Sequence, residues 1–216
     1  LGEATANCFY DAGRDHNAFA EAARRLERRL ADRPHGAWLR LNLGHAKWRD
    51  VAAAEKLFQE AAEGFAAQGE RRGEILARIS LHRILLSLGR ADEAGIQVER
   101  VATLAAAPEA PGTPETPENT DLRARSQILL AKHLIGVAGD LERAYRALQA
   151  ARGAVLGSDN DSLRRDWLLT LANVCKRTGR DRDAQSRYRQ LSQLADRVGT
   201  SRETVTRVLK ELKDSG

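Results

Sequence analysis

The sequence predicts an all-α fold, and three observations support that prediction. Aromatic residues make up only 5% of the chain, while Ala, Arg, Leu and Glu are abundant, so helix-forming residues prevail over strand-forming ones. Apolar residues recur at helical spacing along most of the sequence. Four of the five prolines stand close together, at Pro108, Pro111, Pro114 and Pro117, which leaves the remaining sequence almost free of helix breakers.

A unit of helix, glycine turn and helix recurs in the sequence. Each copy has a glycine followed five residues later by an alanine, with apolar residues four and eight places before the glycine and four and seven places after the alanine. These offsets place the apolar residues on one face of each helix. The pairs are Gly89 with Ala94, Gly139 with Ala144 and Gly179 with Ala184.

The spacing resembles that of the tetratricopeptide repeat (TPR) family, in which a glycine stands at the turn and an alanine where two helices touch. The segment from Trp38 to Ala61 fits the same pattern, with Arg49 where the glycine would stand. The resemblance implies an α-solenoid of stacked antiparallel helix pairs in a right-handed superhelix, with about five repeats and a C-terminal helix. The predicted parts are repeats at approximately 1–34, 35–70, 71–107, 120–157 and 160–199, a mobile Pro-rich loop at 108–119 and a C-terminal helix at 200–216.

In this family the first helices of the repeats line a concave surface, which binds a peptide or a segment of another protein without chemistry. The matching positions form an apolar groove with a basic end, which suits an acidic partner. Asn173, followed one turn later by Lys176 and Arg177, also resembles half of a carboxylate clamp, although a solvated helix end would carry the same cations. The predicted concave-face residues are Leu39, Leu43, Lys47, Leu76, Ile79, Arg83, Leu86, Leu129, His133, Asp166, Leu169, Asn173, Lys176 and Arg177.

The C-terminal segment has two interpretations. As a closing helix it would be capped by Thr200 or Ser201, with Glu203 completing a capping box. The same stretch, at about 191–212, resembles the helix-turn-helix of the Crp/Fnr family of transcription regulators, whose recognition helix reads base edges in the major groove. The base-reading positions that the resemblance implies are Arg202, Glu203 and Arg207.

The net charge of the chain is concentrated at that end. From Lys176 to Gly216 there are 11 Lys and Arg against 6 Asp and Glu, an excess of 5 that equals the net charge of the whole chain, +5. A basic end favours a phosphate-bearing or acidic partner there, although exposed helix faces also carry such charge for solubility alone. Capping and DNA binding therefore both stay open.

Sequence motifs of catalysis and cofactor binding are absent. The chain has no glycine-rich phosphate loop, no HExxH and no nucleophile elbow, and its histidines are scattered, with His45 and His82 at repeat-packing positions. Cys8 and Cys175 stand in no paired or ligand-spaced motif, which favours a reducing, cytoplasmic compartment. We therefore expect no enzyme activity, no cofactor and no metal site.

No apolar run of about 18 residues occurs, so we expect no membrane-spanning segment. The chain contains no Met and begins at Leu1, which indicates a piece of a longer protein. The sequence predicts a non-catalytic protein–protein interaction module, a scaffold or sensor part of a larger signalling or regulatory protein. The alternative is a DNA-binding transcriptional regulator that uses the C-terminal helix-turn-helix, and the oligomeric state stays open.

Overall fold

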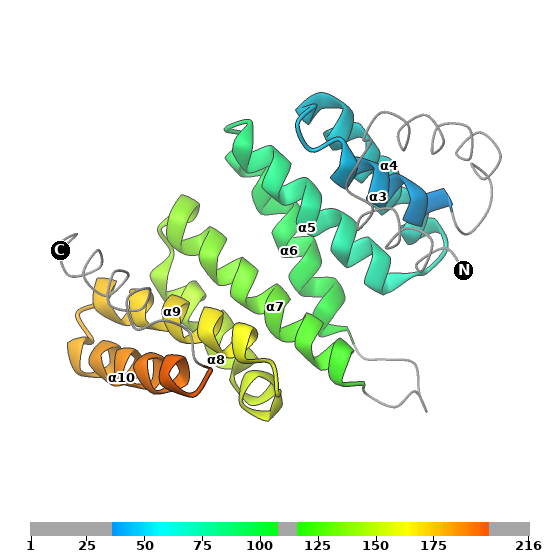
Figure 1. Ribbon diagram of the computed structural model, residues 1–216. Helices are drawn as coiled ribbons and strands as arrows, with labels where there is room; N and C mark the ends of the chain where they lie inside the picture. Colours follow the sequence, from blue (N-terminus) through cyan, green and yellow to red (C-terminus); the bar gives the residue numbers. More distant parts are fainter. Residues whose placement is uncertain (1–35, 108–115, 199–216) are drawn as a thin grey trace. The chain divides into compact units, whose positions relative to one another are not determined.

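The computed structural model describes residues 36–107 and 116–198. Within these two ranges every regular element is a helix (Figure 1), which confirms the all-α prediction. The chain divides into two compact units, residues 1–104 and 105–216, each of which has its own internal packing. The predicted first repeat, residues 108–115 of the Pro-rich loop and the C-terminal helix at 200–216 lie outside the described residues.

The described part of the first unit consists of two helix pairs with a shared apolar core. Phe58 and Phe65 lie on the same face of one helix, two turns apart. Both are fully buried against apolar residues of the neighbouring helices. Acidic residues begin two of the helices, because Asp50 and Glu70 accept hydrogen bonds from the free amides of Ala53 and Gly73. The helices are α3 (Gly36–Ala46), α4 (Val51–Ala67), α5 (Arg71–Ser87) and α6 (Ala91–Ala106), the last of which extends into the second unit.

The described part of the second unit contains two further helix pairs. Successive helices pack against each other along the chain, and α7 also lies beside α9, as Figure 1 shows. Asp140 and Asn160 cap the helices that follow them by accepting the amides of Arg143 and Leu163. The elements are α7 (Pro117–His133), a π-helical turn η1 (Leu134–Ala138), α8 (Leu141–Gly157), α9 (Asp161–Arg177) and α10 (Asp181–Val198).

Helix α7 begins earlier than the sequence indicates. The predicted loop continues to residue 119 and the predicted repeat begins at residue 120, but the helix starts at Pro117. Thr116 supplies the reason, since its hydroxyl oxygen accepts the amide of Asn119 at 3.3 Å and caps the helix. Pro117 at the first helical position has no amide proton to satisfy, and its fixed φ suits the helix.

The glycines predicted at the turns occupy the turns between the paired helices. Gly89, Gly139 and Gly179 have φ angles of 73°, 67° and 71°, a left-handed conformation that a side chain disfavours. The alanines predicted at the helix contacts are also confirmed as buried, with 0%, 0% and 3% of their surface exposed at Ala94, Ala144 and Ala184. Glycine at the turn and alanine at the contact together set the close approach of the two helices.

Candidate protein-interaction surfaces

The predicted concave-face residues of the first unit differ in their exposure. Leu43 is buried, with 1% of its surface exposed, and so is not available to a partner in this structure. Arg83 is exposed, and Leu86 exposes 39% of its surface. The remaining predicted positions on this unit are half-buried: Leu39, Lys47, Leu76 and Ile79.

An aromatic cluster closes the end of the α3–α4 pair. The ring of His45 stacks on Trp48 with centroids 6.3 Å apart, and both rings meet the edge or face of Phe58. The His45 Nε2 atom lies 3.4 Å from the hydroxyl of Ser80 on α5. Burial, and after it the positive charge of Arg83, lower the pKa of His45 below its ordinary value of 6.5.

This environment predicts a pH-dependent stability of the first unit. The folded state holds His45 neutral at a pH where the unfolded chain already binds a proton, so the free energy of unfolding should fall as the pH drops below about 6.5. Above that pH the histidine is neutral in both states and contributes no slope. Urea titrations followed by circular dichroism at several pH values should show a smaller decrease for His45→Gln than for the wild type. Parallel curves for the two proteins would contradict the prediction.

His82 is a buried core histidine, as its repeat-packing position predicts. Only 2% of its surface is exposed, and its Nδ1 atom lies 3.0 Å from the carbonyl oxygen of Ala94 on α6. The ring therefore links the two helices at the contact alanine.

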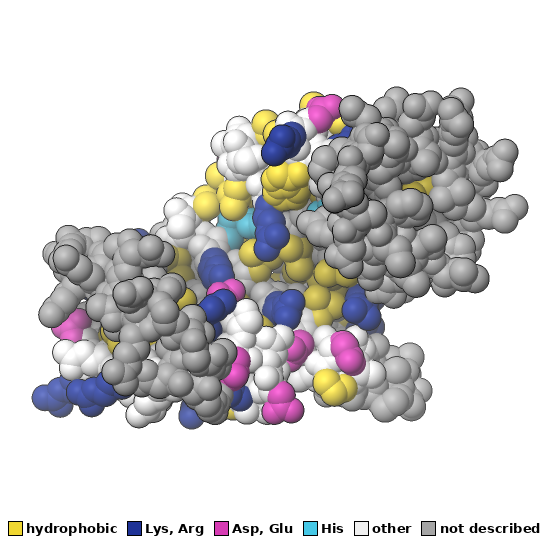
Figure 2. All heavy atoms as spheres, viewed as in Figure 1, with side chains coloured by type: hydrophobic (Ala, Val, Ile, Leu, Met, Phe, Trp, Pro, Cys, Tyr) yellow, Lys and Arg dark blue, Asp and Glu magenta, His cyan; other side chains and the backbone are white. Residues whose placement is uncertain are grey.

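In the second unit, the first helices α7 and α9 pack side by side, and we name the side that carries Leu129 and Leu169 the α7–α9 face. Its apolar members are Leu129 and Leu169, both half-buried, and Asn173 lies one turn beyond Leu169. Figure 2 shows both basic and acidic side chains along the viewed side of α7. The other residues of the α7–α9 face are Arg125, Lys132, Arg165, Asp166, Lys176 and Arg177, and the carboxylates of Asp121 and Asp161 stand at the same helical spacing one turn before Arg125 and Arg165.

An ion pair joins the two helices on this face. The Nζ atom of Lys132 lies 2.9 Å from Oδ2 of Asp166, and each side chain is about half exposed. An exposed pair of this kind is worth about 0.2–1 kcal/mol. The ion pair also fixes geometry, because it holds the carboxylate of Asp166 against α7 and partly neutralises its charge.

Arg177 has a structural partner that the sequence does not indicate. Its guanidinium donates a hydrogen bond of 2.8 Å to the carbonyl oxygen of Ile135 in η1. At the turns of Gly89 and Gly179 an amide reaches back five residues, from Arg90 to Leu85 and from Arg180 to Cys175, whereas the amide of Asp140 reaches back six residues to Leu134. The π-helical turn is thus one residue wider than its counterparts, and Arg177 supports one of its carbonyl groups.

The residues that resemble half of a carboxylate clamp, Asn173, Lys176 and Arg177, lie on one face of α9. Arg177 also makes a structural contact that the pattern does not predict. Asn173 and Lys176 are half-buried and Arg177 is exposed. Because Arg177 also supports η1, its guanidinium is oriented by the fold before any partner arrives. His133, another predicted groove residue, is buried with 8% of its surface exposed.

Three members of the α7–α9 face were not predicted: Arg125, Lys132 and Arg165. A sequence signal was available, because Arg125 and Lys132 flank Leu129 at helical spacing, and Arg165 stands four residues before Leu169. The repeat pattern is defined by its apolar positions and does not indicate these cations.

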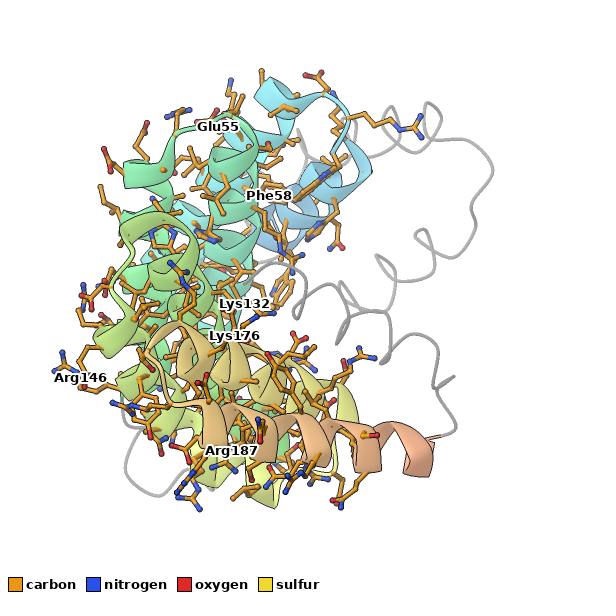
Figure 3. The ribbon with its side chains drawn as sticks, turned by 90° about the vertical axis from the view of Figure 1, so that its left-hand side faces the viewer. Glu55, Phe58, Lys132, Arg146, Lys176 and Arg187 are labelled. Atoms are coloured by element: carbon orange, nitrogen blue, oxygen red, sulfur yellow. The ribbon has the colours of Figure 1, made fainter. Side chains whose placement is uncertain are left out.

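The second helices α8 and α10 carry a separate set of arginines. Arg180, in the turn before α10, stacks over the ring of Tyr145 with 4.4 Å between its guanidinium carbon and the ring centroid. Figure 3 marks Arg146 on α8 and Arg187 on α10, and Lys132 and Lys176 on the α7–α9 face. Arg182 and Arg189 of α10 are exposed. The proposed base-reading residues Arg202, Glu203 and Arg207 lie outside the described residues.

No group of three or more His, Cys, Asp or Glu within residues 36–107 and 116–198 is arranged to hold a metal ion. No helix in the same ranges is long and apolar enough to cross a membrane.

Comparison with solved structures shows the fold. A Podosopora anserina protein described as a kinesin light chain with nearly identical TPR-like repeats is 18% identical, with a TM-score of 0.66 over 93% of this chain and 95% of that chain. BtubC (BKLC) from P. vanneervenii is 14% identical, with a TM-score of 0.73 over 91% of this chain and 79% of that chain. The described helix pairs are therefore TPR-like, as the spacing of the sequence predicts.

Comparison with protein families adds a second finding. The Crp-like helix-turn-helix domain family matches residues 166–216, which supports the resemblance found in the C-terminal sequence. The match begins within α9 and includes all of α10, so it overlaps the last described helix pair. No curated protein matches the chain.

Proposed function

We propose that the chain is a non-catalytic protein-interaction module, the scaffold or sensor part of a larger cytoplasmic signalling or regulatory protein. The TPR-like fold supports this function, because stacked helix pairs build extended binding surfaces rather than enclosed reaction sites. The observation that carries the proposal is the α7–α9 face, where half-exposed leucines and charged side chains share one surface built by two first helices.

The predicted repeats are part of the same proposal. We assign the partner-binding role to the first helices of the repeats at about 35–70, 71–107, 120–157 and 160–199, with the residues of α3 and α5 serving the first unit. Leu43 and His133 would take part only through a rearrangement that exposes them, since both are buried.

Site-specific photo-crosslinking tests the proposal. A photoreactive amino acid at Asn173 on the α7–α9 face should capture a defined protein in cells that make this chain, and Leu169→Asp should abolish that product. The matched control is the same group at Gln193, an exposed position of α10. The proposal fails if position 173 gives no product, or if position 193 gives the same one. Arg177 is left intact because its loss would disturb η1.

DNA binding is the second candidate function. The observation that favours it is the Crp-like helix-turn-helix match over 166–216. The part of that range from Lys176 onward holds 11 basic residues against 6 acidic ones. In this candidate the repeats receive a signal and the segment at about 191–212 binds DNA, with Arg202, Glu203 and Arg207 at base edges.

Binding to duplex DNA at two salt concentrations tests this candidate. The affinity should fall as salt rises, and Arg202→Ala with Arg207→Ala should weaken it by about tenfold or more, since a single base-contacting arginine is worth about 1–3 kcal/mol. Arg143→Ala with Arg152→Ala on α8 is a control of equal charge change. Salt-independent binding, or an equal loss in the control, would rule out this use of the segment.

A further inference from the structure

The glycine turns between the helices share one hydrogen-bond register, which we name the narrow register. At Gly89, the amide of the next residue, Arg90, donates at 2.9 Å to the carbonyl oxygen of Leu85, four residues before the glycine. The turns of Gly69 and Gly179 have the same register, and all three glycines have a positive φ. The narrow register is therefore the usual end of a helix in this chain.

The turn between α7 and α8 has a different, wide register. The amides of Gly139 and Asp140 both donate to the carbonyl oxygen of Leu134, five residues before the glycine. In the narrow register the amide of the glycine donates only three residues back, as from Gly89 to Leu86. The wide register thus places two donors on one acceptor, and it takes these donors from the two carbonyl groups that would receive them in the narrow register.

A side chain of α9 replaces one of the two missing donors. The carbonyl oxygen of Ile135, four residues before Gly139, accepts a hydrogen bond of 2.8 Å from Nη1 of Arg177, and both residues belong to the second unit. The residue of α5 at the same distance before its turn glycine is Ser87, whose hydroxyl donates at 2.7 Å to the carbonyl oxygen of Ile84 in its own helix. The long side chain of Arg177 therefore supplies to Ile135 the hydrogen bond that a backbone amide supplies at the other glycine turns.

We infer that the turn between α7 and α8 has two hydrogen-bond registers, and that Arg177 selects the wide one. While the guanidinium occupies the carbonyl of Ile135, the amide of Asp140 donates to Leu134 instead. When the guanidinium is withdrawn, the carbonyl of Ile135 needs a new donor, and the amide of Asp140 is the group that makes this bond at the equivalent turns. The turn then moves by one residue into the narrow register.

This arrangement couples the end of α9 to a turn that α9 does not contain. Arg177 is exposed, so a group from solution can reach its side chain. A group that binds the guanidinium only when it is away from Ile135 favours the narrow register, because it binds one of the two states better than the other. The inference concerns the turn itself, and its test requires no partner, so it does not depend on the proposed function.

Scalar couplings across hydrogen bonds, measured by NMR in the isotope-labelled full chain, test the inference, since each coupling identifies the carbonyl that accepts a given amide. In the wild type the amide of Asp140 should couple to the carbonyl of Leu134. In Arg177→Met, which keeps a long apolar stem but loses the guanidinium, the coupling should move to Ile135, with a change of about tenfold or more in the ratio of the two registers. Arg165→Met, at an exposed position of the same helix, is the matched control and should leave the coupling on Leu134.

Couplings at the turns of Gly89 and Gly179 are internal references, because their narrow register should be the same in every protein. The inference is wrong if the coupling of Asp140 does not move in Arg177→Met, or if it moves equally in Arg165→Met. It is also wrong if that coupling disappears while the references persist, since the turn would then have no second register. Arg177→Ala is a second variant with the same expected shift, and loss of the reference couplings in both variants would show that Arg177 maintains the fold and does not select a register.

Discussion

Replacing Trp167 with Ala is expected to lower the free energy of unfolding by about 3–5 kcal/mol. The indole exposes 2% of its surface on α9, and its Nε1 donates a hydrogen bond of 2.8 Å to the carbonyl oxygen of Leu148 on α8. The substitution leaves a large cavity between two helices and removes the hydrogen bond that the indole donates to α8. Urea unfolding followed by circular dichroism measures the loss.

Two further variants separate the causes. Trp167→Phe keeps an aromatic ring but removes the donor, so it should cost less than Trp167→Ala and retain a cooperative transition. Trp48→Ala is the control, since that indole exposes 39% of its surface and its loss should be smaller. Equal costs at Trp167 and Trp48 would show that Trp167 does not join α9 to α8 as described.

Gly44→Ala is expected to destabilise the first unit by about 1–3 kcal/mol, although alanine is the better helix former. Gly44 lies within α3, and a Cβ atom there would be 2.5 Å from Cε1 of Phe58. The ring cannot withdraw easily because Phe58 is fully buried and packs against His45 and Trp48. Overpacking should therefore exceed the gain in helix propensity.

Gly153→Ala provides the matched control with the opposite sign. This glycine also lies inside a helix, α8, but nothing stands within 4 Å of the position that its Cβ would take. The same substitution should therefore stabilise the protein by about 0.5–1 kcal/mol. Thermal midpoints that move in opposite directions for the two variants are the expected result. A gain in both would mean that α3 and α4 are not in close contact at Gly44.

Much of the fold is predictable because it depends on local requirements. The turn at Gly89 needs a residue that tolerates positive φ, and the contact at Ala94 needs a small side chain. Both requirements determine the residue type, so both are visible in the sequence. The same glycine and alanine spacing at Gly139 and Gly179 identifies the other helix pairs. The start of α7 was misplaced because the prolines dominate the composition there and the Thr116 cap is a weaker signal.

The remaining features depend on contacts between helices. The wider turn of η1 keeps Ile135 at the same distance before Gly139 as in the other copies, so apolar spacing does not indicate it. The pair of Lys132 with Asp166 and the hydrogen bond from Arg177 to Ile135 join residues 34 and 42 positions apart, which no short pattern records. The burial of Leu43 likewise depends on packing rather than on its position in the repeat.

The overlap of the helix-turn-helix match with α10 affects how this protein can be divided. Leu191 and Leu194 of α10 are buried, and α10 packs along α9, while both helices also belong to the matched range 166–216. A truncation before α10 would remove the helix that packs along α9. A division of the chain after α10 would remove a helix from the matched range. The two parts therefore share a helix instead of a linker, so exchange of either one between proteins must carry α10 with it.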